Sequence, residues 1–111
     1  MYLICLTRKS GYTTRRIEEA TAAAGHRCQT LDPSRMDLLV GSESPLVGVN
    51  VSGPPDQTAI FPRLGALPPE HFMSVVRHFE GQGIRSFNSS DAIRRARDKL
   101  IAYQQMAASG V

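Results

Sequence analysis

The sequence lacks long hydrophobic runs and carries little charge of one sign. No apolar stretch approaches the ~20 residues that a membrane-spanning helix needs. Residues 1–6 have no basic region ahead of their short apolar stretch, as a signal peptide would. The formal net charge of +3 is too small to indicate binding to nucleic acid. We therefore expect a cytoplasmic protein with no membrane partner.

Cysteine and histidine are too sparse to indicate a disulfide scaffold or a zinc site. Cys5 and Cys28 lie in separate apolar runs without Cys-x-x-Cys spacing, which favours buried, reduced thiols. His71 and His78 are seven residues apart rather than four, and His26 stands alone. We expect no metal ligands in this chain.

Familiar catalytic and nucleotide-binding motifs are also missing. The loop at residues 7–11 has one glycine where the dinucleotide fingerprint has three, and no Walker sequence is present. No serine lies in a Gly-x-Ser-x-Gly turn, and neither cysteine has a base nearby in the sequence. We expect neither nucleophilic catalysis nor nucleotide hydrolysis by the chain alone.

The 111 residues suffice for one domain, and the first third has a strand–helix–strand pattern. Residues 2–6 form a continuous apolar run, typical of a strand covered on both faces. A helix is predicted from about residue 13 to 24, capped by Thr13 or Thr14 and stopped by Gly25. Residues 26–31 predict a second strand.

The remaining pattern alternates in the same way. Residues 36–40 and 47–51 predict short strands or a hairpin, and residues 58–62 and 84–87 predict further strands. A helix is predicted to open with Pro68-Pro69-Glu70, since apolar residues recur at helical spacing from there, and further helices are predicted at residues 91–97 and 98–108. Such alternation indicates an α/β fold with a mainly parallel sheet and right-handed crossovers.

Two polar residues follow predicted strands directly. Arg63 ends one strand, at the edge where open α/β sheets bind ligands, and its planar fork suits a carboxylate or phosphate. A structural ion pair is the alternative. After the last strand, Asn88 or Ser89 is predicted to cap the next helix. The alternative for Asn88 is that its side chain faces a ligand, and capping is favoured.

A basic cluster lies near the end of the chain. It has three interpretations: a solvated helix face, a nucleic-acid patch, or a set of cations directed at a neighbouring anion. The absence of interleaved aromatic residues argues against nucleic acid. The cluster consists of Arg94, Arg95, Arg97 and Lys99.

Several short motifs occur in an order that resembles the amino-terminal domain of RimK-type ATP-grasp ligases. They are Gly25-His26, Leu31-Asp32-Pro33, the Pro-Arg-Leu-Gly of residues 62–65, Asn88-Ser89, and the Ala-Arg-Asp-Lys-Leu of residues 96–100. The resemblance implies a three-layer, Rossmann-like pre-ATP-grasp sheet flanked by helices over residues 1–111. The central stretch at residues 41–57 matches poorly.

The resemblance also implies a function. Such ligases use ATP and Mg²⁺ to join a carboxylate to an amine, and the RimK branch adds glutamate to a ribosomal protein. By this comparison Lys99 reaches the nucleotide phosphates, while Arg63 and Asn88 line the substrate cleft. The family's magnesium ligands and glycine-rich flap would lie in an ATP-grasp domain beyond residue 111, so this chain alone is expected to be inactive.

Two other functions stay open at this point. The first is a stand-alone, non-catalytic binding module with the same fold, which would retain an interaction surface around Arg63 and Lys99. Nucleic-acid binding through residues 94–99 would be strongly salt-dependent. The helix faces are also compatible with a homo-oligomer.

Overall fold

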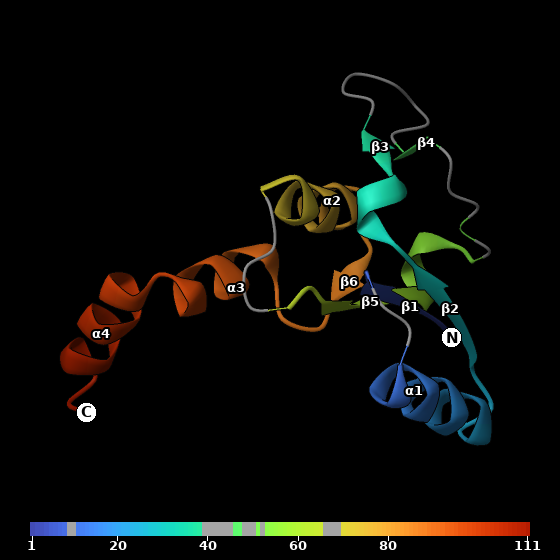
Figure 1. Ribbon diagram of the computed structural model, residues 1–111, viewed down its shortest axis with the longest axis horizontal. Helices are drawn as coiled ribbons and strands as arrows, with labels where there is room; N and C mark the ends of the chain where they lie inside the picture. Colours follow the sequence, from blue (N-terminus) through green and yellow to red (C-terminus); the bar gives the residue numbers. More distant parts are fainter. Residues whose placement is uncertain (9–10, 39–45, 48–50, 52, 66–69) are drawn as a thin grey trace.

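The computed structural model describes residues 1–8, 11–38, 46–47, 51, 53–65 and 70–111. Its centre is a four-stranded parallel sheet in the order β2-β1-β5-β6 (Figure 1). A two-stranded antiparallel sheet of β3 and β4 lies beside it. The strands are β1 (Tyr2–Thr7), β2 (Arg27–Leu31), β3 (Asp37–Leu38), β4 (Leu46–Val47), β5 (Thr58–Arg63) and β6 (Arg85–Ser86). The helices are α1 (Tyr12–Ala23), α2 (Glu70–Gly81), α3 (Ser90–Arg97) and α4 (Lys99–Ala108), with 3₁₀ turns at Pro33–Arg35 and Pro55–Gln57.

The parallel sheet is wound in two directions from its central strands. The chain passes from β1 through α1 to β2 on one side, and from β5 through α2 to β6 on the other. Right-handed crossovers running in opposite directions must place their helices on opposite faces of the sheet. Figure 1 shows α1 and α2 on opposite faces, which confirms the predicted α/β class and its three layers.

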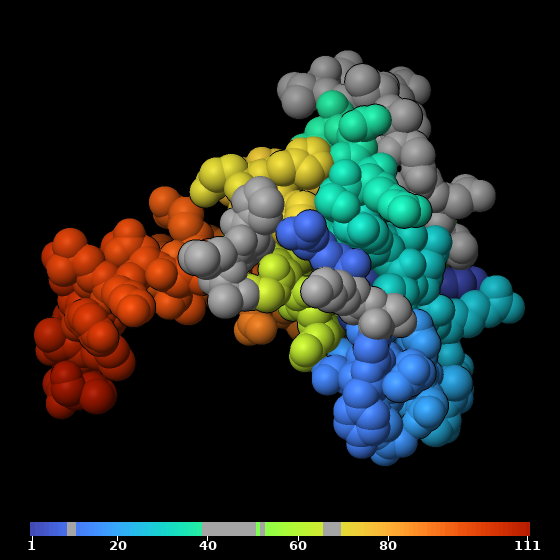
Figure 2. All heavy atoms as spheres, in the orientation of Figure 1, coloured from blue at the N-terminus to red at the C-terminus, as the bar shows by residue number. Residues whose placement is uncertain are grey.

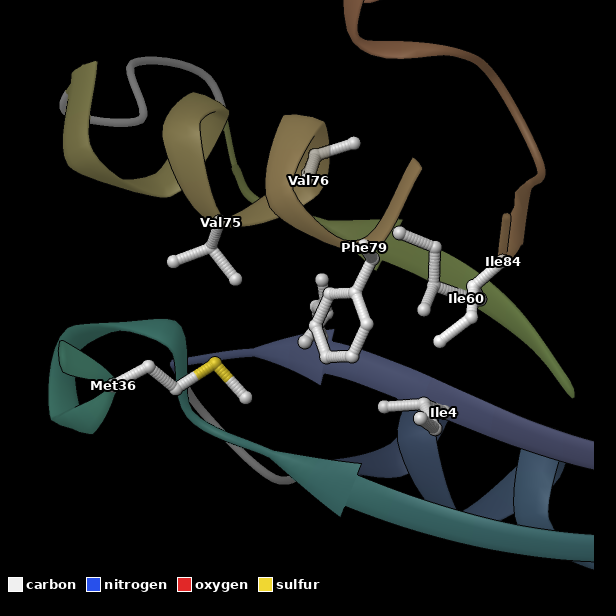
Figure 3. Close-up of a cluster of buried hydrophobic side chains, with 8 residues drawn as sticks. Ile4, Met36, Ile60, Val75, Val76, Phe79 and Ile84 are labelled. Atoms are coloured by element: carbon white, nitrogen blue, oxygen red, sulfur yellow. The ribbon is translucent and has the colours of Figure 1, made fainter. Parts of the chain in front are cut away.

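The main hydrophobic core lies between α2 and the sheet. Figure 3 shows the Phe79 ring directed from α2 toward the strands. Its neighbours come from α2 itself, from β1 and β5, and from the residues that directly precede β3 and β6. The buried cluster comprises Ile4, Leu6, Met36, Ile60, Val75, Val76, Phe79 and Ile84.

The start of α1 differs from the sequence prediction. The N-cap residue is Gly11, which has no side chain to bond the free helix amides, and the predicted caps, Thr13 and Thr14, lie inside the helix. Thr14 is buried within the helix and makes no capping hydrogen bond. The predicted stop is confirmed, since Gly25 has a φ of 81°, a conformation that favours glycine.

The predicted hairpin is present as the short pair β3 and β4, in which Asp37 lies opposite Val47. Residues 39–45, 48–50 and 52, which include most of the predicted strand at 47–51, lie outside the described residues. The same holds for Pro68 and Pro69, so the predicted opening of α2 is described only from Glu70.

The last two helices form an arm that extends away from the sheet (Figure 2). The arm is anchored where α3 begins: the Glu80 carboxylate accepts hydrogen bonds from Ser90 N at 2.8 Å and from Ser90 Oγ at 2.5 Å. Beyond this point α4 buries none of its residues. None of the described helices has the length and apolar character needed to cross a membrane.

Candidate functional site

A pocket of about 370 Å³ lies at the carboxyl ends of β5 and β6. Open α/β sheets bind their ligands outside this end of the strands. The volume falls within the range of roughly 300–1,000 Å³ that is usual for small-molecule sites. The described lining residues are Phe61, Pro62, Arg63, Leu64, Gly65, Asn88, Ile93 and Arg97.

Arg63 is the last residue of β5 and is exposed at the mouth of this pocket. Its register partner is Thr7, the last residue of the adjacent β1. Among the described residues, no carboxylate lies within ion-pair distance of the guanidinium. The alternative of a structural ion pair is therefore not supported by this part of the chain.

Asn88 lies in the turn between β6 and α3. Of the two residues predicted to cap α3, Ser89 is confirmed, and the favoured capping role of Asn88 is wrong. Ser89 is the N-cap, because its hydroxyl accepts a hydrogen bond from Ala92 N at 3.1 Å. Asn88 instead has a φ of 67°, the left-handed conformation that asparagine tolerates better than most residues. This turn brings Asn88 to the pocket that Arg63 lines.

Arg97 belongs to the basic cluster noted in the sequence, but the sequence did not distinguish it from the other three cations. It follows Ile93 by one helical turn, so both residues lie on the face of α3 that lines the pocket. Its Nη1 atom is enclosed and has no hydrogen-bond partner among the described residues. The i, i+4 spacing of Ile93 and Arg97 was the available signal in the sequence. This spacing alone does not show which cation of the cluster lines a pocket.

The basic cluster therefore divides into three parts. Arg94 and Arg95 pair with Asp91 on the exposed surface of α3, at 3.2 and 3.0 Å, which matches the solvated-face interpretation for these two residues. Arg97 lines the pocket, and Lys99 begins α4.

Asp98 separates the pocket residue from the lysine. It ends α3 and also caps α4, because its carboxylate accepts a hydrogen bond from Ile101 N at 3.0 Å. Lys99 is exposed and is not among the residues that line the pocket, so the structure brings Arg63 and Asn88 together but leaves Lys99 apart from them.

Comparison with protein families decides the classification. The family model described as the RimK PreATP-grasp domain matches residues 1–93. The chain belongs to this family. The pocket thus lies on a RimK pre-ATP-grasp domain, and the resemblance drawn from its short motifs is confirmed.

Two similar relatives are both named "Probable alpha-L-glutamate ligase". The one from Stenotrophomonas maltophilia is 38% identical over 120 residues, and the one from Xylella fastidiosa is 40% identical over 116 residues. The match covers 100% of this chain but only 38% and 37% of these relatives. The pre-ATP-grasp domain therefore corresponds to a little over a third of each ligase.

A solved structure supports the fold. The crystal structure of a RimK domain protein ATP-grasp from Sphaerobacter thermophilus aligns with a TM-score of 0.77 and 19% identity. The alignment covers 100% of this chain and 38% of that one. The α/β sheet with its two helical layers is thus the fold of a RimK pre-ATP-grasp domain.

The thiols of the pre-ATP-grasp domain are structural. Burial raises the pKa of Cys5 to about 11, and the neighbouring Cys28 adds to this effect, whereas the Arg63 guanidinium partly opposes it. Burial also raises the pKa of Cys28. Both cysteines are free, as the sequence predicted, but only Cys5 is buried as predicted, and Cys28 is half-buried.

The described residues include no cluster of three or more histidine, cysteine or acidic side chains suited to a metal. Among the carboxyl groups that the structure describes, only that of Asp32 has a clearly lowered pKa, because Ser34 donates its hydroxyl and amide hydrogens to it at 2.6 and 2.9 Å. This carboxylate caps the 3₁₀ turn after β2, which is a structural role.

Proposed function

We propose that this domain forms one wall of the substrate and ATP cleft of an ATP-dependent carboxylate–amine ligase of the RimK type, which adds glutamate. The pocket at the carboxyl ends of β5 and β6 is the observation that carries the proposal, because it presents cationic and amide groups where such folds bind ligands. The names of the relatives support glutamate as the added amino acid.

In this proposal the residues have different partners. Arg63 and Asn88 bind substrate, and Lys99 binds the phosphates of ATP. Lys99 fits this role because its exposed ammonium group has no ion-pair partner among the described residues. Lys99 is also the first residue of α4, the second helix of the arm. When bound, ATP supplies the phosphoryl group that activates the carboxylate.

Magnesium would accompany ATP, but its ligands must come from elsewhere in the parent protein, because the described residues hold no suitable acidic cluster. In this proposal the partner that supplies the magnesium ligands is the ATP-grasp domain of the parent chain. The acceptor of glutamate is a ribosomal protein, and the reaction takes place in the cytoplasm. The 111-residue chain is inactive alone.

Glutamate incorporation tests the proposal. The parent protein should incorporate labelled glutamate into a ribosomal protein only with ATP and Mg²⁺, and the 111-residue chain should neither incorporate glutamate nor hydrolyse ATP. Lys99→Met should lower kcat/KM for ATP by roughly 100-fold, because a charged contact to the phosphates is lost. Arg94→Gln removes an exposed charge from the same arm and is the matched control. Incorporation without ATP, or equal activity of the two variants, would contradict the proposal.

A stand-alone binding module is the second candidate. It is favoured by one observation: Arg63, Asn88 and Arg97 of this chain line one pocket of about 370 Å³. A parent protein that binds ligand here but shows no ATP-dependent incorporation would support this candidate over the ligase.

A further inference from the structure

The pocket at the ends of β5 and β6 carries two positive charges and no negative one on its described walls. Arg63 comes from β5 and Arg97 from α3. The nearby acidic side chains of the arm are occupied: Asp91 pairs with Arg94 and Arg95, and the Asp98 carboxylate caps α4. An anion bound in this pocket would be attracted by both of these positive charges.

Arg97 also lacks a hydrogen-bond acceptor. Its Nη1 atom is buried without a partner among the described residues, and a buried charged donor left unpaired is costly. Native proteins pair nearly all buried polar groups, so an unpaired one in a pocket wall points to a missing acceptor.

The remaining walls indicate what accompanies the anion. Four of them are apolar or largely apolar, and the Phe61 ring is supported by the Phe87 ring at a centroid distance of 6.1 Å. These walls suit the hydrocarbon part of the ligand that carries the anion. The apolar lining residues are Phe61, Pro62, Leu64 and Ile93.

We propose that this pocket is a carboxylate site in which Arg63 and Arg97 bind the carboxylate, Asn88 is the third polar contact, and an aliphatic body lies on the apolar walls. The inference rests on the proposed function and deepens it, since it adds Arg97 as a binding residue and names the ligand class. Planar guanidinium forks match the two oxygens of a carboxylate. The carboxylate belongs either to a free amino acid or to the end of a peptide.

Titration of the ¹⁵N-labelled 111-residue chain tests this site. The probes are L-glutamate, trialanine with a free carboxyl end, and trialanine amide as the uncharged-end control. L-glutamate or trialanine should cause saturable shifts at the amides of Arg63, Asn88 and Arg97, and trialanine amide should not. The tighter of the two carboxylate probes identifies the source of the carboxylate.

Variants show whether Arg97 takes part. Arg97→Gln should weaken binding by roughly tenfold or more, as expected when a charged hydrogen bond is lost. Arg97→Lys, which keeps the charge without the fork, should recover only part of the affinity. Arg94→Gln changes the same charge outside the pocket and should stay within about twofold. Unchanged far-ultraviolet circular dichroism and thermal unfolding will show that each variant is folded.

Three results would overturn the carboxylate site: no saturable shift with either carboxylate probe, equal binding by trialanine amide, or equal affinities of the Arg97→Gln and Arg94→Gln variants. The proposed ligase function fails on a different measurement. ATP-dependent glutamate incorporation by the parent, without carboxylate binding here, would refute the site alone. Carboxylate binding here without incorporation would refute the ligase alone.

Discussion

Replacing Glu80 by alanine should detach the helical arm from the sheet domain. The Glu80 carboxylate bonds both the amide and the hydroxyl of Ser90, which is only 8% exposed at the first turn of α3. Hydrogen bonds to charged groups contribute about 1.5–3 kcal/mol each, and the two share one carboxylate, so their contributions do not simply add. We expect Glu80→Ala to lower the free energy of unfolding by about 2–4 kcal/mol. Ser90→Ala keeps the hydrogen bond from the backbone amide to Glu80, so it should lower this free energy by only about 1 kcal/mol.

Urea denaturation followed by circular dichroism measures the loss, and amide hydrogen exchange shows whether α3 and α4 open before the sheet. Glu19→Ala is the matched control: this glutamate is 62% exposed on α1 and pairs only with the equally exposed Arg16, so its removal should cost less than about 1 kcal/mol. If Glu80→Ala and Glu19→Ala cost the same, or if the amides of α3 keep their protection in Glu80→Ala, the anchor assigned to Glu80 is refuted.

Three further predictions concern the core, the turn and the thiols. Phe79→Ala should lower the free energy of unfolding by about 3–5 kcal/mol, because the ring is fully buried between α2 and the sheet; a loss below about 1 kcal/mol in urea denaturation would contradict this packing. Asn88→Gly should leave stability nearly unchanged, whereas Asn88→Val should cost about 1–2 kcal/mol in the same assay, because its φ of 67° disfavours a β-branched residue; equal stabilities would show that the turn relaxes. Burial raises the pKa of Cys5 from 9.0 to about 11, so the folded state holds the thiol proton more tightly than the unfolded state does. The protonated thiol therefore contributes its full stability below pH 9, and this contribution is lost as the pH rises to 11. Urea midpoints measured across this range should fall more steeply for the unchanged protein than for Cys5→Ala, and parallel curves would refute the assigned cause.

Much of the fold could be predicted because its signals are local. The apolar run in β1 indicated a strand covered on both faces, and the stripe in α2 marked the helix face that the structure buries at Phe72, Val75, Val76 and Phe79. Glycine ended α1 where a left-handed residue was needed, at Gly25. Periodicity and backbone preference act within a few residues, and these features depend on little else.

The caps were less predictable because neighbouring residues compete for one role. Thr13, Thr14 and Gly11 were all near the start of α1, and Gly11 is the N-cap while Thr14 is buried within the helix. Asn88 and Ser89 competed in the same way before α3, where the left-handed backbone at Asn88 left the cap to Ser89.

The sequence by itself determined the α/β class, the family and the position of Arg63 at the end of a strand, because these depend on local pattern and short motifs. Tertiary structure alone decided which cations share a site. Arg94, Arg95, Arg97 and Lys99 are near neighbours in the sequence, yet only Arg97 lines the pocket with Arg63 and Asn88. The Glu80 carboxylate holds the start of α3 through Ser90, and this contact joins residues ten positions apart that no local pattern relates.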